Sequence, residues 1–574
     1  MTDSSLSLSS LIQAASDWQH IDPDPQMRSQ TQKWIDQKDH QALMSAFGSR
    51  LRFGTAGLRG RIGPGPNQMN RALVRQVSYG LSQYLRNTTS LNKTDHLKNV
   101  VIGYDGRNQS WEFAQETASV LVKQGFGVYL SPQLCSTPLL AFSVVHLKAV
   151  AGVMVTASHN PPQDNGFKVY WGNGAQIIPP HDQGISQCIQ EVSRETLKET
   201  LSFEESQKSS LFKWIPNEVE EQYMDEVFKP RLVPRQPNDL KIVYTAMHGV
   251  GYAPFKKVMD RAGYTACFPV EQQVQPDPLF PTVSFPNPEE KGALDLAYQE
   301  AQKQEADLIL AHDPDADRLA VVARQQGKLK SFTGDQIGAL IAHDLFTHLN
   351  LNSNDLVATT IVSSSLLSKM ANQNQIQYTE TLTGFKWIAN ACLAHQADHN
   401  RFLFGYEEAI GYSMHGIVYD KDGVSAALYV ADIAARAKEA GLTLWDKLDE
   451  VYRQYGLYLS SLQSRVRPGL EGAKEIQSLM HTLRTQPPKT IAGLKVDAFL
   501  DYNTLDGVLK GNVLRFQLED QSRIIARPSG TEPKIKFYFE VCQSVPKERS
   551  MEHGYQQAQM RLDVLMKAWN ELLS

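Results

Sequence analysis

The stretch Ala149-Val150-Ala151-Gly152-Val153-Met154-Val155-Thr156-Ala157-Ser158-His159-Asn160-Pro161-Pro162 decides the fold. Its first half is apolar throughout, which is typical of a buried strand. The prolines prevent a helix or a central strand from following directly. Ser158 is therefore predicted to lie on a constrained loop at the carboxyl end of a strand, where open α/β sheets bind ligands. Taken alone, the same residues also fit an ordinary polar turn.

The same order of strand, loop and helix recurs along the chain. Strands are expected at 99–105, 127–130, 240–245, 307–311 and 355–362, and helices at 111–123, 253–262 and 365–373. Strands that alternate with helices indicate doubly wound sheets. We therefore predict an α/β protein with three similar domains whose sheets are mixed but mostly parallel. From about Arg465, short strands and a final helix at 555–573 predict a smaller C-terminal α+β domain.

Length and composition agree with a large cytosolic enzyme. The 574 residues exceed a single core and are expected to divide at 1–213, 214–332, 333–460 and 461–574. The chain is 42% hydrophobic and 21% charged, and its net charge of −5 gives no electrostatic case for nucleic acid or an anionic membrane as partner. The five cysteines are scattered without a CxxC pair, and the N-terminus lacks a signal-peptide pattern. Both features predict a cytoplasmic protein.

A run of alternating aspartates is the strongest candidate for a metal site. Asp313, Asp315 and Asp317 directly follow an apolar strand. Carboxylate oxygens suit Mg²⁺, and three such groups repel one another unless a cation lies between them. On this reasoning, removing one of them could raise the stability of the metal-free protein. An EF-hand is excluded because Arg318 and Arg324 occupy its glycine and glutamate positions. A solvated acidic turn is the remaining alternative.

Two further segments have the composition of anion-binding loops. Residues 527–534 (RPSGTEPK) offer a guanidinium, hydroxyls, a glycine and an ammonium close together, although a simple turn between strands would also fit. Residues 53–60 (FGTAGLRG) are rich in glycine but match neither the P-loop nor the dinucleotide fingerprint. Nucleotide binding therefore does not follow from them.

Together, five segments resemble the active-site loops of the α-D-phosphohexomutase family, in the family's order. They are FGTAGLRG at 53–60, TASHNPPQDNGFKVY at 156–170, HDPDADR at 312–318, GYEEAIGY at 405–412 and RPSGTEPKIKFY at 527–538. The resemblance spans nearly the whole chain. Within the family, the sugar loop GYEEAIGY is closest to the branch that contains phosphoglucomutases and phosphopentomutases.

The resemblance implies a covalent mechanism in which a phosphorylated serine exchanges its phosphoryl group with a sugar phosphate. It implies Ser158, His159, Lys168, Arg59 and Arg318 as catalytic residues. It implies Mg²⁺ on Asp313, Asp315, Asp317 and the phosphate of Ser158, with a sugar 1,6-bisphosphate as activator and intermediate. The substrate would be bound by Glu407, Lys386, Arg527, Ser529, Gly530, Thr531 and Lys534. The fourth domain would be a lid.

The predicted reaction is the interconversion of glucose 1-phosphate and glucose 6-phosphate. Ala409 replaces the serine of the family's Glu-x-Ser pattern, so a phosphopentomutase or phosphomannomutase of the same mechanism remains the first alternative. A Mg²⁺-dependent sugar phosphatase and a non-catalytic sugar-phosphate-binding protein are more remote alternatives. Sugar phosphates are the expected partners, and both a monomer and a dimer fit the sequence.

Overall fold

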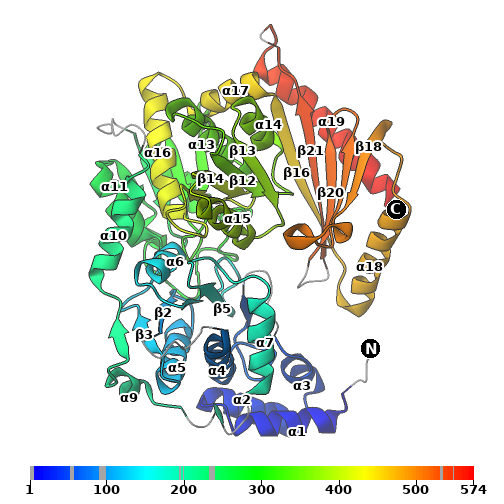
Figure 1. The fold of residues 1–574 in the computed structure, drawn as a ribbon. Helices are drawn as coiled ribbons and strands as arrows, with labels where there is room; N and C mark the ends of the chain where they lie inside the picture. The colour runs from blue at the N-terminus through cyan, green and yellow to red at the C-terminus, as the bar shows by residue number, and fades with distance from the viewer. Residues whose placement is uncertain are drawn as a thin grey trace. The chain divides into compact units, whose positions relative to one another are not determined.

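Four β-sheets organise the chain in the computed structural model (Figure 1). The structure describes residues 6–51, 57–88, 98–192, 196–197, 200–231, 240–529, 534–546 and 548–573. The chain divides into two compact units. Unit one comprises Met1–Arg231, Gln236–Val321 and Ile417–Leu428, and unit two comprises Leu232–Arg235, Val322–Gly416 and Tyr429–Ser574.

The first sheet lies in unit one and has the strand order β1-β5-β4-β2-β3-β6. Its central strands β2 and β4 are parallel and almost completely buried, as their apolar sequences predict. The neighbouring β5 runs antiparallel to β4. The strands are β1 (Leu58–Arg61), β2 (Asn99–Tyr104), β3 (Gly127–Leu130), β4 (Ala151–Val155), β5 (Asp164–Trp171) and β6 (Phe212–Trp214). The helices are α4 (Arg71–Thr88), α5 (Ser110–Lys123), α6 (Thr137–His146), α7 (His181–Glu191) and α9 (Phe203–Gln207).

Three helices precede this sheet and share its core: α1 (Leu8–Gln19), α2 (Pro25–Asp36) and α3 (His40–Phe47). The N-cap residue of each helix accepts a hydrogen bond from a backbone N–H of the first turn through its side chain. The three N-cap residues are Ser7, Asp24 and Asp39. Leu11 and Leu43 are fully buried among the apolar side chains of the sheet. The N-terminal helices are therefore an integral part of unit one.

The second sheet has the order β11-β10-β9-β7-β8, and the boundary between the two units falls within β10. The buried strands β7 and β9 are parallel. The strands are β7 (Ile242–Thr245), β8 (Cys267–Pro269), β9 (Leu308–Ala311), β10 (Ala320–Gln325) and β11 (Lys328–Ser331). The helices are α10 (Asn217–Phe228), α11 (Tyr252–Ala262), α12 (Asp295–Lys303) and the 3₁₀ turn η1 (Glu271–Gln273).

The third sheet lies in unit two with the order β13-β12-β14-β15, in which only the β14–β15 pair is antiparallel. Capping boxes at Thr333 and Thr443 start α13 and α17. The strands are β12 (Leu356–Thr360), β13 (Gln377–Thr381), β14 (Phe402–Glu407) and β15 (Gly411–Met414). The helices are α13 (Gly334–His348), α14 (Leu366–Gln373), α15 (Phe385–Ala397), α16 (Gly423–Glu439) and α17 (Leu444–Tyr455), and the boundary between the two units falls within α16.

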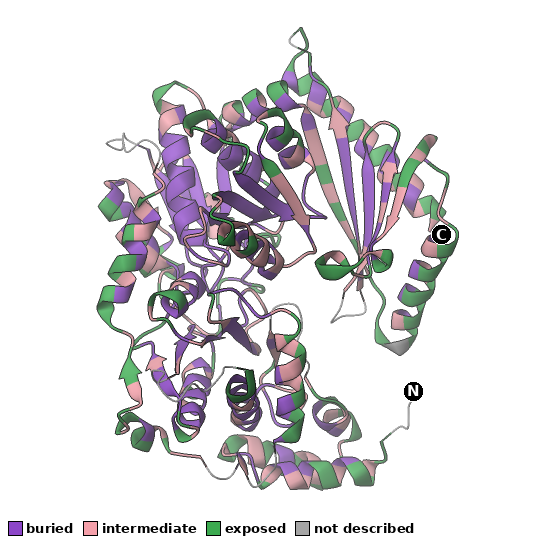
Figure 2. Ribbon diagram, in the orientation of Figure 1, coloured by how far each residue is buried: buried purple, intermediate pink, exposed green. Residues whose placement is uncertain are grey.

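The fourth sheet is antiparallel throughout, with the order β16-β21-β20-β19-β18-β17. Exposed and half-buried residues alternate along β16 because successive side chains point to opposite faces of the sheet, and only one face of an antiparallel sheet needs to be covered (Figure 2). The strands are β16 (Leu457–Val466), β17 (Thr490–Ile491), β18 (Leu494–Asp501), β19 (Leu514–Leu518), β20 (Arg523–Pro528) and β21 (Lys534–Gln543). The helices are α18 (Gly469–Thr485), α19 (Met551–Leu572) and the turns η2 (Tyr502–Thr504) and η3 (Gly507–Leu509).

The predicted fold class is confirmed: three α/β sheets are mixed and a C-terminal α+β region follows them. Among the described residues, no helix is long and apolar enough to cross a bilayer. The four domain boundaries and the lid role of the last domain stay predictions.

Candidate functional site

Ser158 lies three residues after β4, on the loop that the sequence predicted. Its hydroxyl donates a hydrogen bond of 2.6 Å to Asp313 Oδ2 and lies 3.2 Å from His159 Nδ1. Its backbone has a φ of 51°, in the left-handed region that costs a residue with a Cβ about 1–2 kcal/mol. Backbone strain of this kind persists where the surroundings hold it and is concentrated at functional sites. The loop therefore presents one buried hydroxyl to a carboxylate at a fixed distance.

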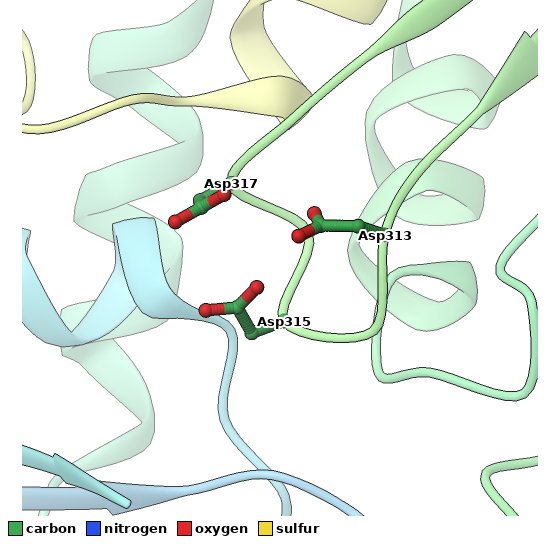
Figure 3. A group of neighbouring side chains, drawn as sticks. All are labelled: Asp313, Asp315 and Asp317. Atoms are coloured by element: carbon green, nitrogen blue, oxygen red, sulfur yellow. The ribbon is translucent and has the colours of Figure 1, made fainter. Parts of the chain in front are cut away.

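The three aspartates lie on one tight loop between β9 and β10 (Figure 3). Ala316 makes the turn with a φ of 57°, and its N–H donates to the carbonyl of Asp313 at 2.9 Å. All three carboxylates are buried, and one oxygen of each lies within 4.8 Å of the others. The turn thus points the side chains of every second residue, Asp313, Asp315 and Asp317, toward one another.

A lysine from the first sheet neutralises part of this charge. Lys168 on β5 places its Nζ 2.7 Å from Asp315 Oδ2 and 3.0 Å from Asp317 Oδ2. Burial alone would raise the pKa of Asp315, but Lys168 and a 2.6 Å hydrogen bond from Thr137 hold it below its ordinary value. Burial, together with Asp315 and Asp317, raises the pKa of Asp313. The loop therefore carries an ion pair with Lys168 at Asp315 and Asp317, and at Asp313 a carboxyl group whose pKa stays raised although the charge of Arg318 lowers it.

The donor set fits a divalent cation. Oδ1 of Asp315 and Oδ1 of Asp317 are buried and have no hydrogen-bond partner among the described residues. Lys168 binds the other oxygen of each, and Arg318 Nε lies 4.0 Å from Asp317 Oδ1. Buried carboxylate oxygens without partners are costly unless a cation or water satisfies them. Hard oxygen donors at one loop are the ligands that Mg²⁺ prefers.

The other predicted catalytic residues lie around the same loops. Arg59 on β1 donates to Asn160 Oδ1 at 3.4 Å. The N–H of Arg318 donates to Asp313 Oδ1 at 3.1 Å. Burial, together with the charges of Arg318 and Arg59, lowers the pKa of His159 well below its ordinary value, so its ring is neutral at neutral pH. Unit one thus brings together Ser158, His159, Lys168, Arg59, Arg318 and the three aspartates.

One further cation at the aspartates comes from a distant part of the chain. Lys421 Nζ lies 3.3 Å from Asp317 Oδ2, and the adjacent Asp420 accepts hydrogen bonds from Tyr170 and Gln176. A Cβ on Gly423 would lie 2.5 Å from the carbonyl oxygen of Arg318, so only glycine allows this close approach. Sequence reasoning missed Lys421. The run Asp420-Lys421-Asp422-Gly423 directly before a long apolar helix was the available signal.

The predicted substrate-binding residues lie in unit two. Glu407 ends β14 and is buried, and Lys386 lies in the first turn of α15. Arg527 lies on β20, and the N–H of Ser529 donates at 2.7 Å to the carbonyl of Lys534 at the start of β21. Gly530 and Thr531 lie outside the described residues, as do Phe53–Ala56 of the first glycine-rich segment.

Comparison with known proteins gives four matches in sequence order. They are phosphoglucomutase/phosphomannomutase α/β/α domain I at 50–196, domain II at 221–327, domain III at 333–455 and the C-terminal domain at 475–553. The fold and these matches define the class of protein: it is an enzyme, an isomerase that acts as an intramolecular phosphotransferase.

Relatives match over most of their own length. A probable phosphomannomutase of Haemophilus influenzae is 42% identical over 84% of this chain and 94% of the relative. The human phosphopentomutase is 35% identical over 93% and 91%, and a Staphylococcus aureus phosphoglucomutase is 37% identical over 86% and 90%. A crystal structure of a putative Thermus thermophilus phosphomannomutase shares the fold, with a TM-score of 0.67 and 22% identity over 92% of this chain and 99% of that one. The chain belongs to the phosphoglucomutase/phosphomannomutase family of α-D-phosphohexomutases.

Proposed function

We propose that the protein interconverts glucose 1-phosphate and glucose 6-phosphate through phospho-Ser158 and a sugar 1,6-bisphosphate. The 2.6 Å contact between Ser158 Oγ and Asp313 is the observation that carries this proposal. It supports a hydroxyl that exchanges phosphoryl groups beside a cation site, since phosphoryl transfer depends mainly on positioning and charge neutralisation. We propose that this reaction takes place in the cytoplasm and that its substrates are small sugar phosphates.

Asp313, Asp315 and Asp317 would hold Mg²⁺ together with the phosphate on Ser158. When bound, the ion would neutralise charge on the transferring phosphoryl group. Although burial lowers the pKa of Lys168, Asp315 and Asp317 raise it above its ordinary value, so this side chain stays an ammonium. Its charge would stabilise the phosphoryl oxygens.

Each transfer also needs a proton to move. When Ser158 receives a phosphoryl group, its hydroxyl proton must leave, and when it returns the group, Oγ must regain a proton. His159 is placed for this exchange because its ring nitrogen Nδ1 lies 3.2 Å from Oγ. Arg59 and Arg318 would add positive charge around the group in transit.

The substrate residues are proposed to grip the part of the sugar phosphate that does not react. Glu407 and Lys386 would contact the sugar. The phosphate that is not transferred would be held by Arg527, Ser529, Gly530, Thr531 and Lys534. Closure of the fourth domain as a lid would keep water from the phosphoserine.

The choice of sugar is tested by comparing turnover of glucose, mannose and ribose 1-phosphates under identical conditions. We expect kcat/KM to be highest for glucose 1-phosphate, with glucose 6-phosphate as product. A higher value for ribose 1-phosphate would favour the second candidate, a phosphopentomutase. That candidate has specific support, because Ala409 lacks the family's serine hydroxyl and phosphopentomutase relatives cover 93% of the chain. Release of inorganic phosphate instead of an isomer would identify a phosphatase.

Arg527→Ala is expected to weaken the binding of both the sugar 1-phosphate and the sugar 6-phosphate. If one anion site holds the substrate in two orientations, the lost charge-assisted hydrogen bonds amount to about 1.5–3 kcal/mol in either direction. Steady-state kinetics in both directions measures this, with Arg484→Ala as control because that arginine pairs with Asp501 elsewhere in the same domain. Phosphorylation of Ser158 should survive in the variant. A loss confined to one substrate would contradict a single phosphate site.

A further inference from the structure

Arg107 lies three residues after β2, and its guanidinium is buried inside the loop that carries Ser158. Nη2 donates hydrogen bonds of 2.5 Å to the carbonyl of Ser158 and 2.6 Å to that of Asn160. Nη1 donates to the carbonyls of Pro161 at 2.8 Å and Asp164 at 3.1 Å. A single side chain thus binds four carbonyl oxygens, three of the loop after β4 and one of the first residue of β5.

Arg107 is itself fixed by the end of its own strand. Its Nε lies 3.4 Å from Asp105 Oδ2, and its backbone N–H donates to Asp105 Oδ1 at 3.0 Å. The guanidinium carbon lies 5.0 Å from the ring centroid of Phe280, which comes from the second sheet's part of unit one. The arginine is therefore held by a carboxylate on its edge and an aromatic ring on its face.

The same carboxylate also reaches Ser158 by a second route. Thr156 Oγ1 donates to Asp105 Oδ2 at 2.6 Å and accepts a hydrogen bond of 2.8 Å from the backbone N–H of Ser158. Both backbone polar groups of Ser158 are therefore tied to the Asp105–Arg107 pair, one through Arg107 and the other through Thr156. This closed network spans the residues on either side of the nucleophile.

The loop needs such a partner for two reasons. Pro161 and Pro162 have no N–H, so the loop has fewer internal donors for its carbonyls. In addition, Ser158 has a φ of 51°, which a non-glycine residue keeps only where its surroundings over-determine it. Arginine suits the task because its donors form a planar fork, whereas the ammonium of lysine is a compact point donor.

We propose that Arg107 is a positioning residue for the nucleophile: by binding the carbonyls of residues 158–164, it holds Ser158 in the backbone conformation that keeps Oγ beside Asp313. Arg107 acts through the loop backbone and does not itself contact Oγ among the described hydrogen bonds. The proposal rests on the proposed function, in which Ser158 Oγ carries the phosphoryl group.

The test is Arg107→Ala in the full chain, assayed with and without added guanidinium chloride at low concentration. We expect kcat to fall about 100-fold, the scale of a displacement of about 1 Å in a reacting group. KM should change little, because the residues proposed to bind the sugar phosphate lie elsewhere. Guanidinium should restore part of kcat by occupying the vacated site, and methylammonium, which lacks the planar fork, should not.

Arg75→Ala is the matched control. Arg75 is a mostly buried arginine of the same unit that pairs with Glu116 at 2.6 Å and has no hydrogen bond to the loop. Its loss should lower the melting temperature while kcat stays at the wild-type value and does not respond to guanidinium. A purely structural role for Arg107 would give the same pattern as this control.

Arg107→Lys keeps the charge and most of the volume, so it tests the proposal even if the alanine variant does not fold. We expect the same loss of kcat, because one ammonium does not reach all four carbonyls. A wild-type kcat in either Arg107 variant, or a loss that appears only in KM, would overturn the positioning role. Absence of turnover and of phosphoserine in the wild-type protein would instead contradict the proposed function.

Discussion

Ser158→Ala is expected to lower mutase turnover by about 10⁴-fold or more, the scale of losing a covalent nucleophile. The hydroxyl oxygen is the only atom of the side chain that can carry the phosphoryl group, and it lies on a loop whose carbonyls are bound by Arg107. Intact-mass measurement and peptide mapping should find a phosphate on Ser158 in the wild-type protein and none at position 158 in the variant.

The control is Ser143→Ala, which removes another buried hydroxyl of unit one that donates only to the carbonyl of Leu139. That variant should keep both its turnover and the phosphate on Ser158. Full activity in Ser158→Ala would rule out the covalent mechanism, whatever the sugar preference.

Asp315→Asn is expected to lower turnover by about 1000-fold, because a catalytic cation contributes several kcal/mol and this change removes one charged ligand. Turnover is measured over a Mg²⁺ titration after exhaustive chelation. The wild-type protein should lose its activity on chelation and regain it with Mg²⁺, while the variant should stay impaired at saturating Mg²⁺. Undiminished turnover of the chelated wild-type protein would contradict the metal requirement.

For the stability of the metal-free protein, the structure leads us to expect the opposite effect of a substitution at Asp315 from the one that the sequence suggests. Repulsion between three aspartates suggested that losing one could stabilise the metal-free protein. Lys168 changes this balance, since its buried ammonium would lose one of its two carboxylate partners. Breaking a buried ion pair costs about 3–5 kcal/mol, so we expect thermal unfolding in chelator at a lower temperature than for the wild type.

Asp344→Asn is the matched control for Asp315→Asn in both the thermal unfolding and the Mg²⁺ titration. Asp344 is another buried aspartate, paired with Arg436 at 2.6 Å in unit two and absent from the proposed site. Its loss should also lower the melting temperature, but the response of turnover to Mg²⁺ should stay that of the wild type. Equal behaviour of the two variants in the Mg²⁺ titration would argue against Asp315 as a ligand.

The strands were predictable because burial on both faces leaves an apolar run that local sequence reveals. The predicted strand at 99–105 and helix at 111–123 are β2 and α5, displaced by a single residue at most. The loop of the three aspartates was predictable for a similar reason, because its three carboxylates are close together in sequence. The resemblance to a known family supplied Lys168, whose distance from the aspartates along the chain gives no local pattern.

Long-range partners were not predictable from local pattern. Arg107 looks like an ordinary polar residue after a strand, and only the folded loop shows that four carbonyls surround its guanidinium. Lys421 lies more than a hundred residues from Asp317 in sequence. The three N-terminal helices also gave no functional motif, although their apolar faces belong to the core of the first sheet.

The division of the site between two sheets has a consequence for which parts of the chain the reaction requires. The first three domains are alike in architecture, yet the serine follows a strand of the first sheet and the aspartates follow a strand of the second. Backbone N–H groups of Thr137 and Val250 donate to the aspartate loop from the two sides. A chain with only the first domain would therefore have Ser158 without the three aspartates, and a chain with only the second would have the aspartates without the serine. The contact between Ser158 and Asp313 therefore exists only where both sheets are present and docked on each other.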